Sequence, residues 1–174
     1  NQIFAVGGLP VACLTDPERA HAVVDAVESR LRTPFGLRSL APGQNDYVAV
    51  YGGNPSWRDG HYHQGPVWPW LAGPFVDAWL RVRGYSDAAV AQARSEFVAP
   101  MLQQLREGGV GHVSELTDAE SPWSPKGAPF QAWSLGEMLR VLEFVAGGGK
   151  RSSRPASDAG AAVGRIEHQA GDRS

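Results

Sequence analysis

Four segments of the sequence repeat their apolar residues at helical spacing, and this repetition limits the folds open to the chain. Residues 16–32 and 86–108 each carry one apolar stripe, as expected of helices with one face in a core and the other in solvent. Residues 67–83 and 129–145 are apolar on nearly every side, a pattern typical of helices that are buried all round. A strand-like stretch, residues 47–51, is short and ambiguous. We therefore expect an all-α protein.

The connections between these predicted helices alternate between short and long. Two long connections, residues 33–66 and 109–128, precede the two helices that are apolar all round. Because consecutive elements usually lie beside one another, we expect antiparallel helices with both long connections at the same end. Loops of that length commonly carry function. Helical hairpins that alternate between an inner and an outer layer are typical of a toroid, and so few helices predict an incomplete ring with apolar surface left open.

Residues 62–75, with the sequence YHQGPVWPWLAGPF, place three prolines and two tryptophans at the predicted start of the second helix. Pro66 and Pro69 suit a helix start, because the amide protons that they lack would be unpaired there anyway. Pro74 lies deeper, where we expect it to bend the helix axis unless a neighbouring group satisfies the carbonyl of Trp70.

The composition argues against several classes of partner. A net charge of -2 without a dense basic run is unlike a binder of nucleic acid or of anionic membranes, and no run of about 18 apolar residues could span a membrane. The single cysteine, Cys13, cannot form an internal disulfide, so we expect a cytoplasmic protein in which this small side chain is buried. We expect residues 1–146 to form one folded unit and residues 147–174, rich in small and polar side chains, to be a disordered tail. The first residue is Asn1 rather than Met, so we expect a piece of a longer protein.

Aromatic rings and polar side chains gather in the two long connections, and this combination suits a sugar. A sugar ring stacks on tryptophan or tyrosine and pairs its hydroxyl groups with carboxylate, guanidinium, imidazole or amide groups. Trp68 and Trp133 are candidates for lining such a pocket, with filling of the core as the alternative. His61, His63 and His112 could converge on a metal ion, but a spacing of one residue within a loop is permissive rather than diagnostic, so we expect no metal and no cofactor.

Cleavage of a glycosidic bond needs one carboxylic acid that protonates the leaving oxygen and one carboxylate that acts on the other face of the sugar ring. Glu115 is the favoured candidate because its apolar neighbours, Val113 and Leu116, can hold it firmly. A structural or solvated role for Glu115 is the alternative. Asp118 and Glu120 lie in a polar stretch, and we expect both to be solvated.

Five separated motifs follow one another across residues 1–145, namely NQIFAV, TPFGLRSL, RDGHYHQGPVWPWLAGPF, SELTD and PFQAWSLGEMLRVL. Together they resemble the C-terminal part of the glycogen debranching enzyme family, its amylo-α-1,6-glucosidase domain. The resemblance implies an (α/α)6 toroid to which this chain gives the last helices. It also implies hydrolysis of α-1,6-linked glucose at the branch points of glycogen or a related α-glucan, and a partner in the N-terminal part of the same domain.

The resemblance also implies roles for individual residues. Glu115, in the motif SELTD, corresponds to the general base that activates water in an inverting reaction. The general acid is an aspartate from an earlier part of the domain, so the fragment alone is expected to be inactive. The motif RDGHYHQGPVWPW lines the sugar pocket in such proteins, which implies substrate-binding roles for Arg58, Asp59, Tyr62, His63, Gln64 and Trp68.

Two other interpretations of the same residues stay open. One is a different glycosidase of the same architecture, such as a trehalase-like, glucoamylase-like or sugar-epimerase-like relative, in which His63 could be the acid-base group. The other is a module that has no catalytic role and only binds glucan or stabilises a partner.

Overall fold

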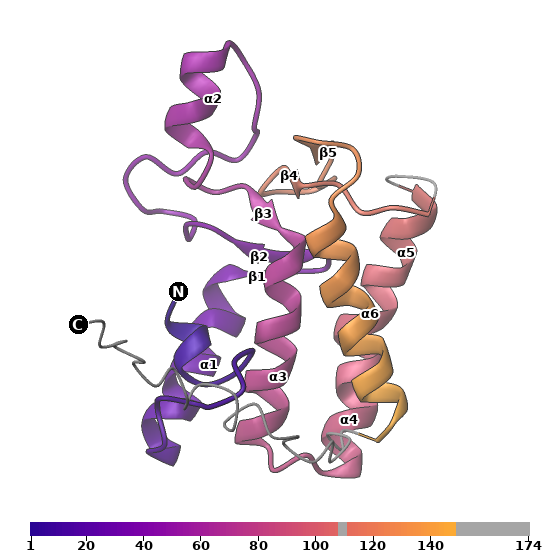
Figure 1. Cartoon of the computed structure of the whole chain (residues 1–174). Coiled ribbons are helices and arrows are strands. Elements are labelled where there is room, and N and C mark those ends of the chain that lie inside the picture. The colour runs from indigo at the N-terminus through magenta and orange to yellow at the C-terminus, as the bar shows by residue number, and fades with distance from the viewer. Residues whose placement is uncertain (108–110, 149–174) are drawn as a thin grey trace, which may run out of the picture.

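The computed structural model describes residues 1–107 and 111–148, and these ranges are mostly helical (Figure 1). The helical elements are η1 (Gln2–Ala5), α1 (Pro17–Leu31), α2 (Pro55–His61), η2 (Pro69–Leu71), α3 (Ala72–Val82), α4 (Asp87–Ala93), η3 (Arg94–Val98), α5 (Ala99–Glu107) and α6 (Ala132–Ala146). The strands are β1 (Arg32–Thr33), β2 (Gly36–Arg38), β3 (Val67–Trp68), β4 (Leu116–Thr117) and β5 (Pro125–Lys126). Nearly all of the predicted tail lies outside the described residues.

Two predicted helix starts are confirmed by their caps. The carboxylate of Asp16 accepts a hydrogen bond of 2.9 Å from the backbone N–H of Arg19, and α1 begins at the next residue, Pro17. The hydroxyl of Ser86 accepts a 3.3 Å bond from the backbone N–H of Ala89 at the start of α4. The helix predicted after Ser86 runs on as α4, a π-helical turn (η3) and α5.

The helix predicted from residue 67 begins later than expected. Val67 and Trp68 form β3, Pro69 opens the 3-10 turn η2, and α3 starts only at Ala72. Pro74 is therefore in the first turn of α3, where backbone N–H groups have no partner within the helix. The expectation that Pro74 lies deep in the helix is wrong.

The all-α prediction is wrong in one respect, because the chain also forms a small antiparallel sheet. Its five strands follow the order β1-β2-β3-β4-β5. Leu37 of β2 lies opposite Trp68 of β3, and Val67 lies opposite Thr117 of β4. Strands of two or three residues are too short to show an alternating apolar pattern, so the sequence carried no signal for them. Residues 47–51, the one stretch considered as a strand, form none.

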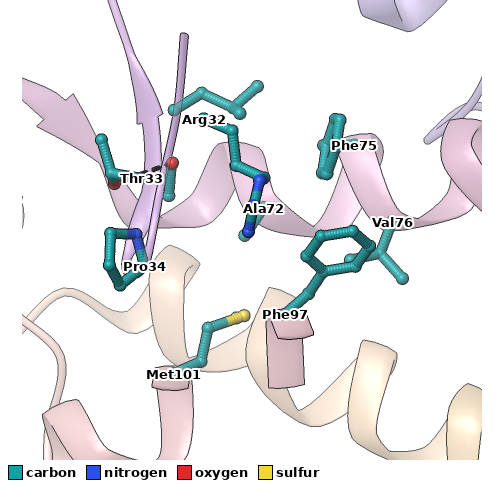
Figure 2. Close-up of a pocket in the computed structure, with 10 residues that line it drawn as sticks. Arg32, Thr33, Pro34, Ala72, Phe75, Val76, Phe97 and Met101 are labelled. Atoms are coloured by element: carbon teal, nitrogen blue, oxygen red, sulfur yellow. Dashed lines mark hydrogen bonds between the residues drawn. The ribbon is translucent and has the colours of Figure 1, made fainter. Parts of the chain in front are cut away.

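The main core lies around α3, which packs between α1 and α6 (Figure 1). Trp79 of α3 is fully buried, as the sequence predicted, and its indole N–H donates a 3.0 Å hydrogen bond to Glu28 of α1. Below the β1–β2 hairpin, side chains that include Phe75, Phe97 and Met101 leave a gap of only about 10 Å³ (Figure 2). That volume holds at most one water, so this gap is packing rather than a ligand site.

The helix α6 is less covered than predicted. Leu139 is 58% exposed on the side of α6 that faces solvent, together with the exposed residues Gly136 and Glu143. Trp133 at the start of the helix is 57% exposed, and Phe130 just before it is 61% exposed. The closed toroid therefore stays a prediction. Cys13 is also exposed, which contradicts the expectation that it is buried. No helix in the two described ranges is both long and apolar enough to cross a membrane.

Candidate active site

The sheet joins the two long connections at one end of the helices. Strand β3 lies in the first connection and β4 in the second, and they pair through Val67 and Thr117. In Figure 1, α2 and the β4–β5 hairpin lie at the same end of α3 and α6. This pairing confirms that both connections meet, and it brings the segment around Glu115 close to Trp68.

Glu115 is held at both its backbone and its carboxylate. Its backbone N–H donates to the carbonyl of Ala128 at 2.9 Å, and its Oε2 accepts a 3.0 Å bond from the backbone N–H of Ala128. The other oxygen, Oε1, accepts a short hydrogen bond from the hydroxyl of Tyr62. Gly127 has a φ of 68°, and a Cβ there would overlap Oε2 of Glu115, so a glycine is required beside this carboxylate.

An aromatic cluster surrounds the hydroxyl that bonds Glu115. The ring of Tyr62 lies edge-on to His63 and to Trp68, with centroid distances of 4.9 and 4.8 Å. The rings of His63 and Trp68 stack at 5.1 Å. Trp68 is buried and packs with Leu116, the residue after Glu115. Three residues of the predicted sugar-binding set are thus in contact with one another and, through Tyr62, with Glu115.

A hollow of about 490 Å³ opens beside this cluster. Its size is within the range of about 300 to 1,000 Å³ that is typical of small-molecule sites. Its polar and aromatic wall includes His63, Trp68 and Trp133, and the ring of Trp133 stacks on Trp70 at 3.9 Å. Leu31 and Leu37 contribute to its apolar wall. Glu115 is not part of the lining, so Tyr62 and Trp68 connect the hollow with the carboxylate.

Arg58 and Asp59 lie on α2, a helix that the sequence analysis missed although Asn54 caps it. Both side chains are exposed. Burial raises the pKa of the Tyr51 hydroxyl, the charge of Arg58 lowers that pKa, and the charges of Glu115 and Asp59 raise it further. The charges of Arg58, Asp59 and Glu115 therefore all influence the pKa of the same hydroxyl, that of Tyr51.

Gln64 contributes its backbone to the same region. Its carbonyl accepts a 2.7 Å hydrogen bond from the backbone N–H of Val48, and its own backbone N–H donates to the backbone carbonyl of His61 at 3.2 Å. These bonds fix the chain on either side of His63.

The prediction that Asp118 is solvated is wrong. It is 5% exposed, its carboxylate accepts a 2.8 Å bond from the backbone N–H of Tyr51, and it lies 3.7 Å from the ammonium group of Lys126. These contacts make Asp118 a structural link between the two long connections. A carboxylate committed to a backbone bond and an ion pair is poorly suited to moving a proton to a substrate.

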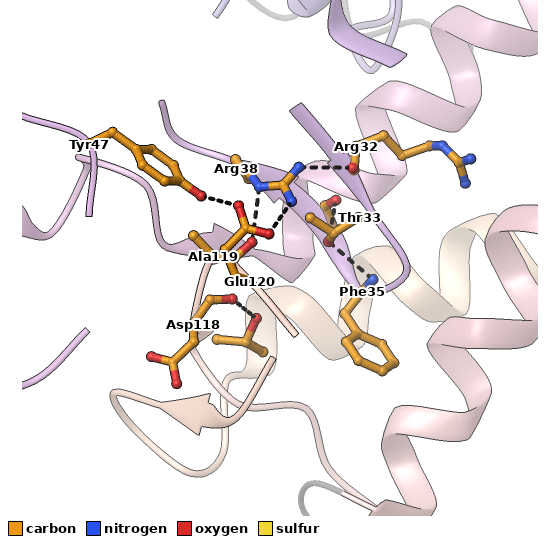
Figure 3. A network of polar contacts seen from close by, with 10 residues as sticks. Arg32, Thr33, Phe35, Arg38, Tyr47, Asp118, Ala119 and Glu120 are labelled. Carbon is orange, nitrogen blue, oxygen red and sulfur yellow. Dashed lines mark hydrogen bonds and ion pairs between the residues drawn. The ribbon is translucent and has the colours of Figure 1, made fainter. Parts of the chain in front are cut away.

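Glu120 belongs to a polar network that the sequence analysis missed (Figure 3). Its Oε2 lies 3.3 Å from the guanidinium of Arg38, and its Oε1 accepts a 2.5 Å hydrogen bond from the hydroxyl of Tyr47. Arg38 also donates to the carbonyls of Ala119, at 2.9 Å, and of Arg32, at 3.3 Å. Burial, followed by the bond to Glu120, raises the pKa of Tyr47 to about 12. The network fastens the loop after β4 to β2.

The histidines considered for a metal site have separate aromatic neighbours. His61 stacks on Trp57 of α2, His63 stacks on Trp68, and His112 contacts Phe130. Within residues 1–107 and 111–148, no three His, Cys, Asp or Glu side chains gather closely enough to hold a metal ion.

Comparison with known proteins agrees with the motifs found in the sequence. A family model described as amylo-alpha-1,6-glucosidase matches residues 1–140. The chain is also similar to the glycogen debranching enzyme of Saccharomyces cerevisiae, with 29% identity over 157 residues. That match covers 80% of this chain and 10% of the relative, so the chain spans about a tenth of the length of the relative. Because the family model covers most of the sequence, the chain belongs to the amylo-alpha-1,6-glucosidase family.

Proposed function

We propose that this chain carries the general base and part of the sugar-binding surface of an α-1,6-glucosidase that acts on branch points of glycogen or a related α-glucan. The observation that carries the proposal is the setting of Glu115, whose carboxylate is fixed by Tyr62 and Ala128 beside the aromatic cluster. The family and the name of the yeast relative support the substrate class.

The arrangement of Glu115 suits the activation of water. One donor binds each carboxylate oxygen, Tyr62 at Oε1 and Ala128 at Oε2, and a carboxylate has further lone pairs that can accept a water. In an inverting reaction, this carboxylate takes a proton from the water as the water oxygen bonds to the anomeric carbon. The bond to the leaving oxygen breaks on the opposite face, and a carboxylic acid donates a proton to that oxygen.

The general acid in this proposal comes from outside the chain. An inverting site places its two carboxyl groups about 6.5 to 9.5 Å apart. Asp118 is committed to Tyr51 and Lys126, and Asp59 is exposed on α2. We therefore assign the acid to another part of a longer enzyme, and we expect this chain alone to be inactive.

Replacement of Glu115 in the full-length enzyme tests the proposal. Glu115→Gln should lower turnover by about 10²-fold to 10⁴-fold, the usual contribution of a general base, while glucan binding is largely kept. Turnover is measured on an α-1,6-linked oligosaccharide, and proton NMR of the first product should show the β anomer. A matched Glu18→Gln variant on α1, where Glu18 is exposed, controls for the same loss of one negative charge away from the site. Wild-type turnover in Glu115→Gln would contradict the proposal.

A substrate panel separates the alternatives. Preference for α-1,4-linked glucose or for trehalose would indicate a glucoamylase-like or trehalase-like enzyme. Binding of glucan without turnover by the full-length protein would indicate a module without a catalytic role.

A further inference from the structure

We propose that Tyr62 is a positioning residue that holds the carboxylate of Glu115 through its hydroxyl, working against the Gly127–Ala128 turn on the other side. This inference rests on the proposed role of Glu115 as general base. It adds a residue that acts through Glu115 and does not itself exchange a proton with the substrate.

The contacts of Glu115 come from two separate parts of the chain. Tyr62 follows α2 and donates to Oε1, whereas Ala128 follows β5 and donates to Oε2 at 3.0 Å. Both the backbone and the carboxylate of Glu115 are bonded to Ala128, so the Ala128 side is rigid. The bond to Tyr62 then fixes the rotation of the carboxylate that the Ala128 side leaves open.

Gly127 leaves no free space on the Ala128 side. A Cβ at this position would overlap Oε2 and would lie 3.0 Å from the Cβ of Glu115. Oε2 therefore lies close against the Gly127 turn, while the Tyr62 hydroxyl holds the other oxygen, Oε1. A misplacement of about 1 Å at a reacting group can cost about 10²-fold in rate.

Tyr62 is suited to act as a permanent donor. Burial, followed by the hydrogen bond and the charge of Glu115, raises the pKa of the Tyr62 hydroxyl above its usual value of about 10. The phenol consequently keeps its proton at every pH at which an ordinary tyrosine keeps its own. Its ring is fixed by edge-on packing against His63 and Trp68.

The test uses the full-length enzyme and α-glucosyl fluoride, a substrate whose fluoride leaves without a proton from the general acid. Tyr62→Phe keeps the ring and its packing and removes only the hydroxyl. We expect kcat to fall by about 10-fold to 10²-fold, with KM within about threefold of the wild type. Tyr85→Phe is the matched control. Tyr85 lies in the turn between α3 and α4, outside both long connections, and its ring packs on Phe144 of α6. This variant should behave as wild type.

A second background shows whether Tyr62 acts through Glu115. In Glu115→Ala, azide can replace the activated water: it bonds to the anomeric carbon as the carbon–fluorine bond breaks, giving β-glucosyl azide and fluoride. We expect Glu115→Ala and Glu115→Ala/Tyr62→Phe to form this azide at rates within about twofold of each other, since effects that run through one group are not additive.

The outcomes separate the two proposals. Wild-type kcat in Tyr62→Phe, or an equal loss in both backgrounds, would overturn the positioning role of Tyr62. Wild-type turnover in Glu115→Ala, or no β-glucosyl azide from it, would overturn the role of Glu115 instead. Should Tyr62→Phe fail to fold, Gly127→Ala displaces the same carboxylate from the side of the turn. A normal kcat in that variant would show that the position of the Glu115 carboxylate does not limit the rate, and it would overturn the positioning role of Tyr62.

Discussion

Arg38 shows how one residue can organise a loop that is distant in sequence. Its guanidinium bonds the carbonyl of Ala119, the carboxylate of Glu120 and the carbonyl of Arg32. Hydrogen bonds to charged groups contribute about 1.5 to 3 kcal/mol each. Tyr47 completes the network by donating to the second oxygen of Glu120. These bonds hold the loop that follows the segment of Glu115.

The Tyr47–Glu120 bond predicts a loss of stability at alkaline pH. The pKa of Tyr47 is raised from 10.0 to about 12 in the folded state, so the folded state holds this proton more tightly than the unfolded state does. Its contribution is complete below pH 10 and is lost as the pH rises toward about 12. Urea unfolding of the chain should show a smaller loss of stability across this range in Tyr47→Phe than in the wild type. The difference in tyrosinate absorbance between the two proteins should titrate near pH 12, and a midpoint near 10 would contradict the network.

The elements differ in how far the sequence determines them locally. The helix α1 was predicted almost to the residue, because its cap at Asp16 and its stripe through Val24 and Val27 are adjacent in sequence. The strands were missed because each has two or three residues and gains its stability from partners far along the chain, such as Val67 with Thr117. The small number of helices predicted that some apolar surface would stay open, but not that it would lie on α6, since an apolar pattern does not state which other elements are present to cover it.

The packing of α3 on α6 depends on a buried acid, which gives a prediction for these two helices. Arg140 of α6 donates to Asp77 of α3 at 2.8 Å and to Glu137 at 2.7 Å, and the side chain of Asp77 is only 5% exposed. Arg140→Met keeps the aliphatic stem but removes the charge that faces Asp77. We expect a loss of about 1 to 3 kcal/mol in the free energy of unfolding, the usual cost of weakening the pairing of a buried polar group.

Urea unfolding of the chain measures this loss, with Arg81→Met on the exposed side of α3 as the control. A loss of the same size in both variants would show that Asp77 does not need Arg140. If Asp77 does need the charge of Arg140, the double variant Asp77→Asn/Arg140→Met should be more stable than Arg140→Met alone, because the amide carries no charge.

At the scale of the whole molecule, the site is formed where the two long connections meet. The sequence predicted this meeting from helix directions alone, and β3 and β4 confirm it. The bond from Tyr62 to Glu115 was beyond the reach of the sequence, because it joins side chains 53 positions apart whose directions depend on the sheet. The catalytic role of Glu115 stays a prediction. So do the sugar-binding roles of the other candidates, namely Arg58, Asp59, Tyr62, His63, Gln64, Trp68 and Trp133.

The predicted ring requires that the outer side of α6 be covered in the full-length enzyme. Leu139 is 58% exposed on the side of α6 that it shares with Gly136 and Glu143, which are exposed as well. Leu139→Glu should change the stability of the isolated chain by no more than about 0.5 kcal/mol, as is usual for surface substitutions. In the full-length enzyme the same change would bury a charge, and thermal unfolding should begin several degrees lower, about 2 to 4 °C for each kcal/mol in a large domain.

Val11→Glu is the matched control for this prediction, because Val11 is 76% exposed in the loop between η1 and α1, away from α6. If α6 forms part of a closed ring, hydrogen exchange of residues 133–145 should also be slower in the full-length enzyme than in the isolated chain, since covered helices open less often. Equal effects of Leu139→Glu in the chain and in the enzyme, together with equal exchange, would mean that this side of α6 faces solvent in both. The incomplete ring would then have to close elsewhere, or the architecture would be an open stack of hairpins.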